Sequence, residues 1–131
     1  QDLNYYKELL KNFTSKKMIC TNPDLIVDRG KKREYCAGSV AMIFEKIGGE
    51  VIYFGKPYPE VYNQATNSNK KKIIAIGDNL RTDIKGANNM NYDSLVITKG
   101  VHNQEFEKES IENVLKNYNV KATFSQSILK W

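Results

Sequence analysis

Charged residues follow two apolar runs of the sequence. Lys56 comes just after the apolar run VIYF at 51–54. Asp78 comes just after the apolar run IIAI at 73–76, and Asp83 stands five residues further on. A lysine and carboxylates are the groups that stabilise phosphoryl charge and bind Mg²⁺. They can do this chemistry together only if the fold brings the ends of both runs to one place.

A parallel sheet would bring these residues together. A continuous apolar run such as 73–76 is typical of a strand buried on both faces of a parallel sheet. In open α/β sheets, ligands bind beyond the carboxyl ends of the strands, so Lys56 and Asp78 are expected to share one crevice. Asp78 is a candidate Mg²⁺ ligand there. Asp83 would join the metal shell or hydrogen-bond Lys56, which would offset phosphoryl charge.

Simpler roles are open for the same residues. Asp78 or Asn79 could only cap the helix predicted to begin near Leu80, which is the commonest role for such residues. Asp83 could merely suit the helix dipole in the first turn. Lys56 could be a loop lysine. Spacing alone does not decide between these roles, because short motifs have many false positives.

The first part of the chain alternates helical and strand patterns. Apolar residues at helical spacing predict a helix over 2–13, and the short run KMIC predicts a strand over 17–20. Residues 25–36 are basic and loop-like, with room for a short strand at 25–27. A helix over 37–49 ends in two glycines, as many helices do.

The alternation continues to the end of the chain. The predicted elements are a buried strand at 51–54, a helix from Pro59, a polar connector at 66–72, a strand at 73–76, a helix from Leu80, a strand at 94–98, a helix at 108–118 and a strand at 120–124. Leu80, Ile84 and Ala87 fall on one helix face. Strands that alternate with helices predict a parallel, helix-flanked α/β sheet.

Composition narrows the class of protein. The 131 residues are 40% hydrophobic and 27% charged, which suits a folded core in one domain or pieces of two. The net charge of +5 comes from scattered lysines, so we expect a solvated surface and no nucleic-acid partner. Cys20 and Cys36 form no C-x-x-C pair and are expected to be reduced, in a cytoplasmic chain without a membrane span. His102 is expected to be a surface residue rather than a catalytic base.

Four motifs together resemble a known family. GKP at 55–57, followed by GDNLRTDI at 77–84, resembles the third and fourth motifs of the haloacid dehalogenase (HAD) superfamily of phosphatases. The similarity is closest to its class IIA branch, which includes p-nitrophenyl-phosphatase-like and sugar-phosphatase-like members. That branch also has TNPD in its cap, seen here at 21–24, and a glycine-rich helix start, seen here as CAGSV at 36–40.

The resemblance implies an α/β fold, with a Rossmann-like parallel-sheet core and an inserted α/β cap. Residues 1–53 would be a partial cap domain, and residues 54–131 the C-terminal half of the core. The implied activity is Mg²⁺-dependent hydrolysis of a phosphomonoester, with a small phosphorylated metabolite as substrate. Asn22 and Asp24 look like cap residues near the substrate.

The same resemblance implies a role for each residue of the two charged stretches. Lys56 looks like the lysine that stabilises the nucleophile and the phosphate charge. Asp78 looks like the Mg²⁺-binding aspartate, and Asp83 like its supporting acid. Asn79 is similar to a residue that helps to hold the metal site.

The chain departs from the family at the nucleophile. The superfamily uses the first aspartate of an Asp-x-Asp motif to form an aspartyl-phosphate, and no two aspartates here have that spacing. The chain also opens with Gln1 rather than methionine. We therefore expect a fragment that is inactive alone and completed by the missing N-terminal half of the same protein. Strands 51–54 and 73–76 would otherwise leave an apolar edge, which favours a homodimer or another partner segment.

Two other interpretations are open. The chain could be a non-enzymatic remnant of a truncated gene that survives as an interaction module. A receiver-like signalling domain also uses strand-end acids and a lysine. That class needs an acidic pair and a phosphoacceptor aspartate early in the chain, and the sequence has neither.

Overall fold

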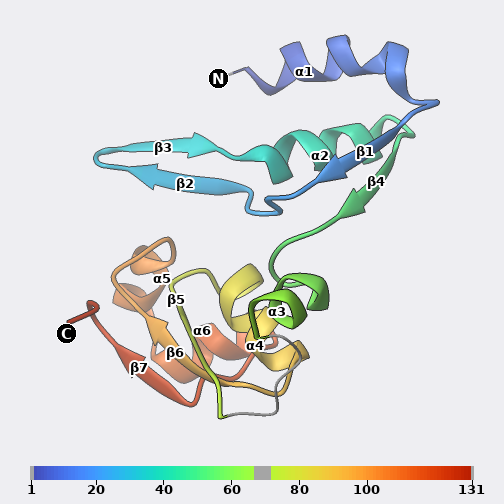
Figure 1. The fold of residues 1–131 in the computed structure, drawn as a ribbon. Coiled ribbons are helices and arrows are strands. Elements are labelled where there is room, and N and C mark those ends of the chain that lie inside the picture. Colours follow the sequence, from blue (N-terminus) through green and yellow to red (C-terminus); the bar gives the residue numbers. More distant parts are fainter. Residues whose placement is uncertain (1, 67–71, 131) are drawn as a thin grey trace. The chain divides into compact units, whose positions relative to one another are not determined.

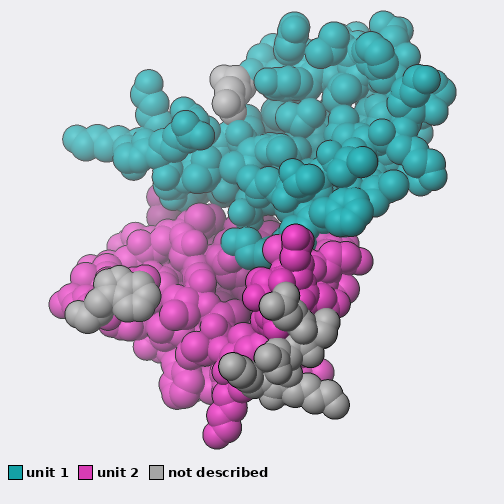
Figure 2. All heavy atoms as spheres, viewed as in Figure 1, with its two compact units in different colours: residues 1–56 teal, residues 57–131 magenta. Residues whose placement is uncertain are grey.

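The computed structural model describes residues 2–66 and 72–130. The chain divides into two compact units, residues 1–56 and 57–131, which are coloured separately in Figure 2. Most of the predicted connector at 66–72 lies outside the described residues. No helix in the described part of the chain is long and apolar enough to cross a membrane.

The first unit is built on two parallel strands and two helices (Figure 1). Helix α1 (Leu3–Leu10) runs into a 3₁₀ turn, η1 (Lys11–Phe13), and strand β1 (Lys17–Cys20) follows. β1 pairs in parallel with β4 (Glu50–Tyr53), and helix α2 (Ala37–Lys46) comes between them in the sequence. The helix and strand predicted at 2–13 and 17–20 are thus confirmed.

Helix α2 provides the buried centre of this unit. Ala41 and Phe44 are 0% and 1% exposed, and Cys20 on β1 is also buried. Gly49 packs directly against the Phe44 ring, where a side chain would collide with it. Gly48 has a φ of +93°, the left-handed conformation that commonly ends a helix, so the glycine pair ends α2 as predicted.

The predicted loop at 25–36 is wrong for most of its length, because a β-hairpin forms there, and its first strand overlaps the short strand expected at 25–27. Strands β2 (Ile26–Arg29) and β3 (Lys32–Tyr35) pair antiparallel and are joined by a two-residue turn. Gly30 adopts a φ of +61° in that turn. Arg33 donates two hydrogen bonds to the Asp28 carboxylate across the pair, at 2.8 and 2.9 Å. The dense charge hid the strand alternation, although the opposite charges support the pairing.

The second unit is a three-stranded parallel sheet with helices. Its strands run in the order β5 (Ile74–Gly77), β6 (Asp93–Ile97) and β7 (Phe124–Gln126). Its helices are α3 (Pro59–Thr66), the π-helical turn η2 (Leu80–Ile84), α4 (Lys85–Asn89), α5 (Asn103–Lys108) and α6 (Ile111–Asn117). The predicted parallel α/β class is therefore confirmed, and Figure 1 shows the three strands side by side.

Two predicted boundaries in this unit are wrong. The helix expected over 108–118 begins only at Ile111, because the Ser110 side chain caps it by accepting the Asn113 N–H. The strand expected over 120–124 begins only at Phe124. The Asn88 side chain exchanges two 2.8 Å hydrogen bonds with the backbone of Lys121, and these take the place of strand pairing there.

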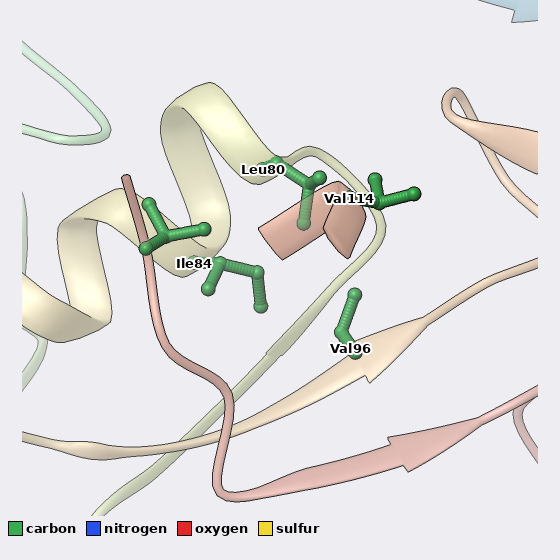
Figure 3. Packing of buried hydrophobic residues seen from close by; sticks show 5 residues of the cluster. Leu80, Ile84, Val96 and Val114 are labelled. Carbon is green, nitrogen blue, oxygen red and sulfur yellow. The ribbon is translucent and has the colours of Figure 1, made fainter. Parts of the chain in front are cut away.

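The core of the second unit joins the sheet to the helices. Leu80 and Ile84 come from the helix after β5, Val96 from β6 and Val114 from α6, and they point toward one another in Figure 3. These four side chains are at most 1% exposed, and Ala87 is also fully buried. The predicted apolar face of Leu80, Ile84 and Ala87 is thus confirmed. Its packing holds the start of the helix next to the end of β5.

The two apolar runs are not buried on both faces as predicted, and their exposure agrees with the apolar edge expected of these strands in a fragment. On β5, Ile74 and Ile76 are 47% and 42% exposed, and on β4, Ile52 is 38% exposed. Ile76, Leu95 and Phe124 are partners across the sheet of the second unit, so they share a face away from Val96. Apolar composition alone did not reveal that the helices here bury one side of each strand.

Candidate active site

The turn after β5 holds two of the predicted site residues in a defined arrangement. Asn79 is the N-cap of the following helix, and its side-chain Oδ1 accepts the Arg81 N–H at 3.0 Å. The Asn79 N–H donates in return to Oδ2 of Asp83 at 3.1 Å. Asp83 therefore points back to the strand end, which satisfies a backbone donor of the helix start.

The helix begins with a π turn that keeps Asp83 in this position. The N–H groups of Asp83 and Ile84 both donate to the Asn79 carbonyl, at 2.8 and 3.2 Å. Leu80 and Ile84 are fully buried on the apolar side, while Asp83 is 8% exposed. Such widened turns are rare and occur often at functional sites. The turn thus anchors a buried carboxylate at the strand end.

Gly77 provides the space for that carboxylate. A Cβ atom at position 77 would overlap the Asp83 side chain, including its carboxyl group. The glycine is therefore required by close packing rather than by a left-handed backbone. The structure thus identifies Asp83 as the group that approaches the Gly77 backbone closely.

Asp78 is oriented by the neighbouring strand. Its Oδ2 accepts the backbone N–H of Val101 at 2.9 Å, in the loop that follows β6. Gly100 lies against the Asp78 side chain, where a Cβ would collide with it. The helix cap is Asn79 and not Asp78, so the Asp78 carboxylate sits between two adjacent strand ends.

Tyr62 on α3 lies on the same side of the unit as Asp83. Burial, and then the negative charge of Asp83, raise the pKa of Tyr62 to about 12. Its hydroxyl group packs against Gly86, and its ring makes an edge-to-face contact with Tyr92 at 6.1 Å. Tyr62 is therefore a neutral packing residue at neutral pH.

The first unit ends at the predicted lysine. Gly55 has a φ of +99° and lies against the carbonyl oxygen of Thr21, so only glycine fits there without strain. Lys56 follows as a half-buried residue. Because Lys56 and Asp78 belong to different units, their meeting in one crevice stays a prediction.

The cap-like motifs form one turn in the first unit. The Asn22 side chain accepts the Asp24 N–H at 3.2 Å, and the Asp24 carbonyl accepts the Gly38 N–H at 3.2 Å. A Cβ at Gly38 would collide with the backbone of Pro23 and Asp24. TNPD is thus held on the glycine-rich start of α2, and the contact of Asn22 and Asp24 with substrate stays a prediction.

Sequence reasoning missed a cluster around His102. This histidine is 4% exposed, so the expected surface position is wrong. Glu105 accepts hydrogen bonds from His102 Nδ1 at 2.8 Å and from the Tyr118 hydroxyl at 2.9 Å. The Arg81 guanidinium lies 5.0 Å from the centre of the Tyr118 ring. The available signal was the spacing of His102 and Glu105, which places both on one side of a helix start.

The charge of Glu105 fits this arrangement. Burial acts to raise the pKa of Glu105, but the hydrogen bonds from His102 and Tyr118, with the charges of His102 and Arg81, hold it below its ordinary value. An ionised carboxylate accepts hydrogen bonds only, so His102 carries its proton on Nδ1. His102 Nε2 is buried without a hydrogen-bond partner in the described structure.

A broad groove elsewhere in the second unit is separate from these residues. It is lined by residues such as Tyr92, Asp93, Lys116 and Thr123, near the amino ends of β6 and β7. Ligands of open parallel sheets bind at the opposite, carboxyl ends of the strands. The position of the Asp78 turn at the carboxyl ends of the strands, rather than the size of the groove, therefore makes this turn the candidate site.

The part of the chain that carries this turn also matches a known family. Residues 53–121, more than half of the chain, match the family model described as HAD-hydrolase-like. A strand-end aspartate with a second acid in the following helix is the arrangement that the sequence resemblance led us to expect. The chain belongs to the haloacid dehalogenase-like hydrolases.

Individual relatives identify the branch. Over 89 residues, the chain is 32% identical to the ribonucleotide monophosphatase NagD of Escherichia coli, a match that covers 65% of this chain and 34% of NagD. A haloacid dehalogenase-like hydrolase from Brucella suis is 35% identical with a TM-score of 0.71, covering 78% of this chain and 43% of that one. An NPPase from Geobacillus stearothermophilus is 26% identical with a TM-score of 0.63, covering 95% and 47%.

These relatives confirm the class IIA phosphatase resemblance. The chain spans about a third of the length of the curated relatives it matches. Phosphatases of this superfamily generally use a divalent metal. Within residues 2–66 and 72–130, no group of three or more His, Cys, Asp or Glu residues is placed to hold a metal. Asp78 and Asp83 still offer hard carboxylate donors, which fit Mg²⁺ when water and phosphate complete its shell.

Proposed function

We propose that this chain is the C-terminal part of a Mg²⁺-dependent phosphomonoester hydrolase that acts on a small phosphorylated metabolite in the cytoplasm. The observation that carries the proposal is the turn after β5. There a buried Asp83 and an Asp78 held by the Val101 N–H both lie at the carboxyl end of β5, beside the loop after β6, in a chain of the HAD family. The relatives named as phosphatases support the same reaction class.

We assign each residue of the turn a separate role in binding the metal and the phosphate. Asp78 would coordinate Mg²⁺, Asn79 would help to hold the site, and Asp83 would be the supporting acid. Bound Mg²⁺ supplies electrostatic stabilisation of the charge on the phosphoryl group. Lys56 would bind the same group with its ammonium charge, since phosphoryl transfer depends mostly on positioning and electrostatics. Asn22 and Asp24 would contact the remainder of the substrate.

The nucleophile would come from outside this chain. In the proposed reaction an aspartate of the N-terminal half attacks phosphorus and forms an aspartyl-phosphate, which water then hydrolyses. The 131 residues alone would therefore be inactive. The exposed face that includes Ile74 and Ile76, 47% and 42% exposed on the edge strand β5, is a suitable place for the missing half of the core to pack.

Mutation of Asp78 tests this function in the complete protein. Asp78→Ala should nearly abolish Mg²⁺-dependent hydrolysis of p-nitrophenyl phosphate. Asp93→Ala is the matched control, because Asp93 is an exposed aspartate at the first residue of β6, away from the carboxyl ends of the strands. Turnover that survives Asp78→Ala, or that falls equally in both variants, would contradict the metal assignment.

A second candidate is an interaction module without activity. The exposed apolar residues of the strands favour it as well, because such a surface on a folded chain invites association with a second copy. Sedimentation of the isolated chain over a range of concentrations distinguishes the two. A concentration-independent homodimer that does not bind the N-terminal half would favour the module over the phosphatase.

A further inference from the structure

The His102 cluster reaches the candidate site through one peptide bond. His102 follows Val101, whose N–H holds Oδ2 of Asp78 at 2.9 Å. Gly100, on the other side of Val101, packs against the same Asp78 side chain. The loop after β6 is therefore the element that orients Asp78. Whatever fixes this loop also fixes the direction of the carboxylate.

His102 is the buried end of that loop. Its side chain is 4% exposed, and its ring makes an edge-to-face contact with Tyr118 at 4.7 Å between ring centres. Its Nδ1 donates to Glu105 at 2.8 Å, and Glu105 also accepts the Tyr118 hydroxyl. Tyr118 packs against the main core of the unit. The loop is thus tied to the core by a hydrogen bond to an ionised acceptor, which is stronger than a neutral one.

The His102 cluster also contacts the turn after β5 through Tyr118, which lies against Arg81. Arg81, whose backbone N–H is capped by Asn79, places its guanidinium 5.0 Å from the centre of the Tyr118 ring. The same tyrosine therefore contacts residues from both strand-end loops. A change in the His102–Glu105 pair is expected to move the loop around Asp78 before it disturbs the helix that follows β5.

We propose that His102 is a positioning residue, which holds the Gly100–Val101 peptide in place and so directs the Asp78 carboxylate toward the metal. The proposal rests on the function proposed above for Asp78. It uses only Nδ1 of the histidine, since Nε2 has no partner in the described structure. A side chain that presents a donor at the Nδ1 position should therefore replace His102, and one that presents it further out should not.

Amide hydrogen exchange of the 131-residue chain tests this without metal or substrate. In His102→Asn the side-chain amide lies near the Nδ1 position, and the Val101 N–H should stay protected. In His102→Gln and His102→Phe, the loss of the bond to Glu105 should speed exchange at Val101 by about tenfold or more. The reference is the Tyr92 N–H, which donates to Ala87 at 2.9 Å away from the cluster and should not change.

The outcomes separate positioning from general stability. Faster exchange at Val101 alone in the Gln and Phe variants, with rescue by Asn, supports the proposal. Equal acceleration at Val101 and Tyr92, or unchanged exchange at Val101 in folded Gln and Phe variants, overturns it. Because the exchange experiment uses neither metal nor substrate, its failure is distinguishable from a failure of the proposed function, which the Asp78→Ala variant tests through Mg²⁺-dependent turnover.

Discussion

Gly77→Ala is the substitution that probes the acidic turn most directly. A methyl group at position 77 would overlap the carboxyl group of Asp83, which is 8% exposed and has little room to move. Asp83 must rotate away or the strand end must shift. Either movement breaks the 3.1 Å hydrogen bond from the Asn79 N–H. The substitution therefore disrupts both the packing and the hydrogen bonding of the turn.

The expected loss of stability comes from two terms. A hydrogen bond to a charged acceptor contributes about 1.5–3 kcal/mol, and overpacking costs about 1–3 kcal/mol. Replacing glycine stiffens the unfolded chain and returns about 0.4–1 kcal/mol. The free energy of unfolding should therefore fall by roughly 2–5 kcal/mol, a large part of the total for a chain of this size.

Chemical denaturation measures this loss in the free energy of unfolding, and a double-mutant cycle shows how much of it comes from the contact between positions 77 and 83. In an Asp83→Gly background the overlapping side chain is absent, so Gly77→Ala should change stability by less than about 1 kcal/mol. The coupling between positions 77 and 83 should thus account for most of the loss. If Gly77→Ala costs the same in both backgrounds, or costs nothing in the wild type, the proposed contact between Gly77 and Asp83 is wrong.

Two titrations follow from the same residues. Tyr62 should be the last observed tyrosine to ionise, near pH 12, because burial and then the charge of Asp83 raise its pKa. The stability that neutral Tyr62 contributes is complete below the ordinary pKa of 10.0 and is lost as pH rises through 12. In an ultraviolet titration of tyrosinate, Asp83→Asn should lower the pKa of Tyr62. The pKa of Glu105 is lowered by His102 and Tyr118 against the effect of burial, so its contribution is present above the ordinary value of 4.5 and is lost as pH falls below it. Denaturation at several acidic pH values should show a shallower decline for Glu105→Gln than for the wild type, and equal slopes would refute the role of the hydrogen bonds.

Local patterns predicted the elements that carry the site. The strand at 17–20 has the observed bounds, and the face of Leu80, Ile84 and Ala87 is fully buried as expected. These features depend on spacing within a few residues, which the sequence displays directly. The turn at Asp78 could be located for the same reason, since it follows an apolar run and precedes a helical one.

Contacts between distant segments could not be predicted. Val101 lies 23 residues beyond Asp78, and Tyr118 lies 13 residues beyond Glu105. The spacing of residues within a helix or strand carries no information about such distant contacts. His102 was therefore interpreted as an isolated polar residue in a loop. The hairpin at 26–35 was missed for a related reason, because its strand signal lies in cross-strand charge pairs that appear only once the register is known.

The exposed side of β5 connects these results to the proposed function. Ala75 and Gly77 face the helices with Ser94 and Val96, and that face needs small residues at β5 because Asp83 packs on Gly77. Ile74 and Ile76 point to the other face, where these large apolar side chains of an edge strand are exposed, and such exposure favours association. A further part of the core packed on this side would explain their size. The acidic turn, in contrast, is built by contacts within the second unit, so the proposed metal site does not depend on such a further part for its geometry.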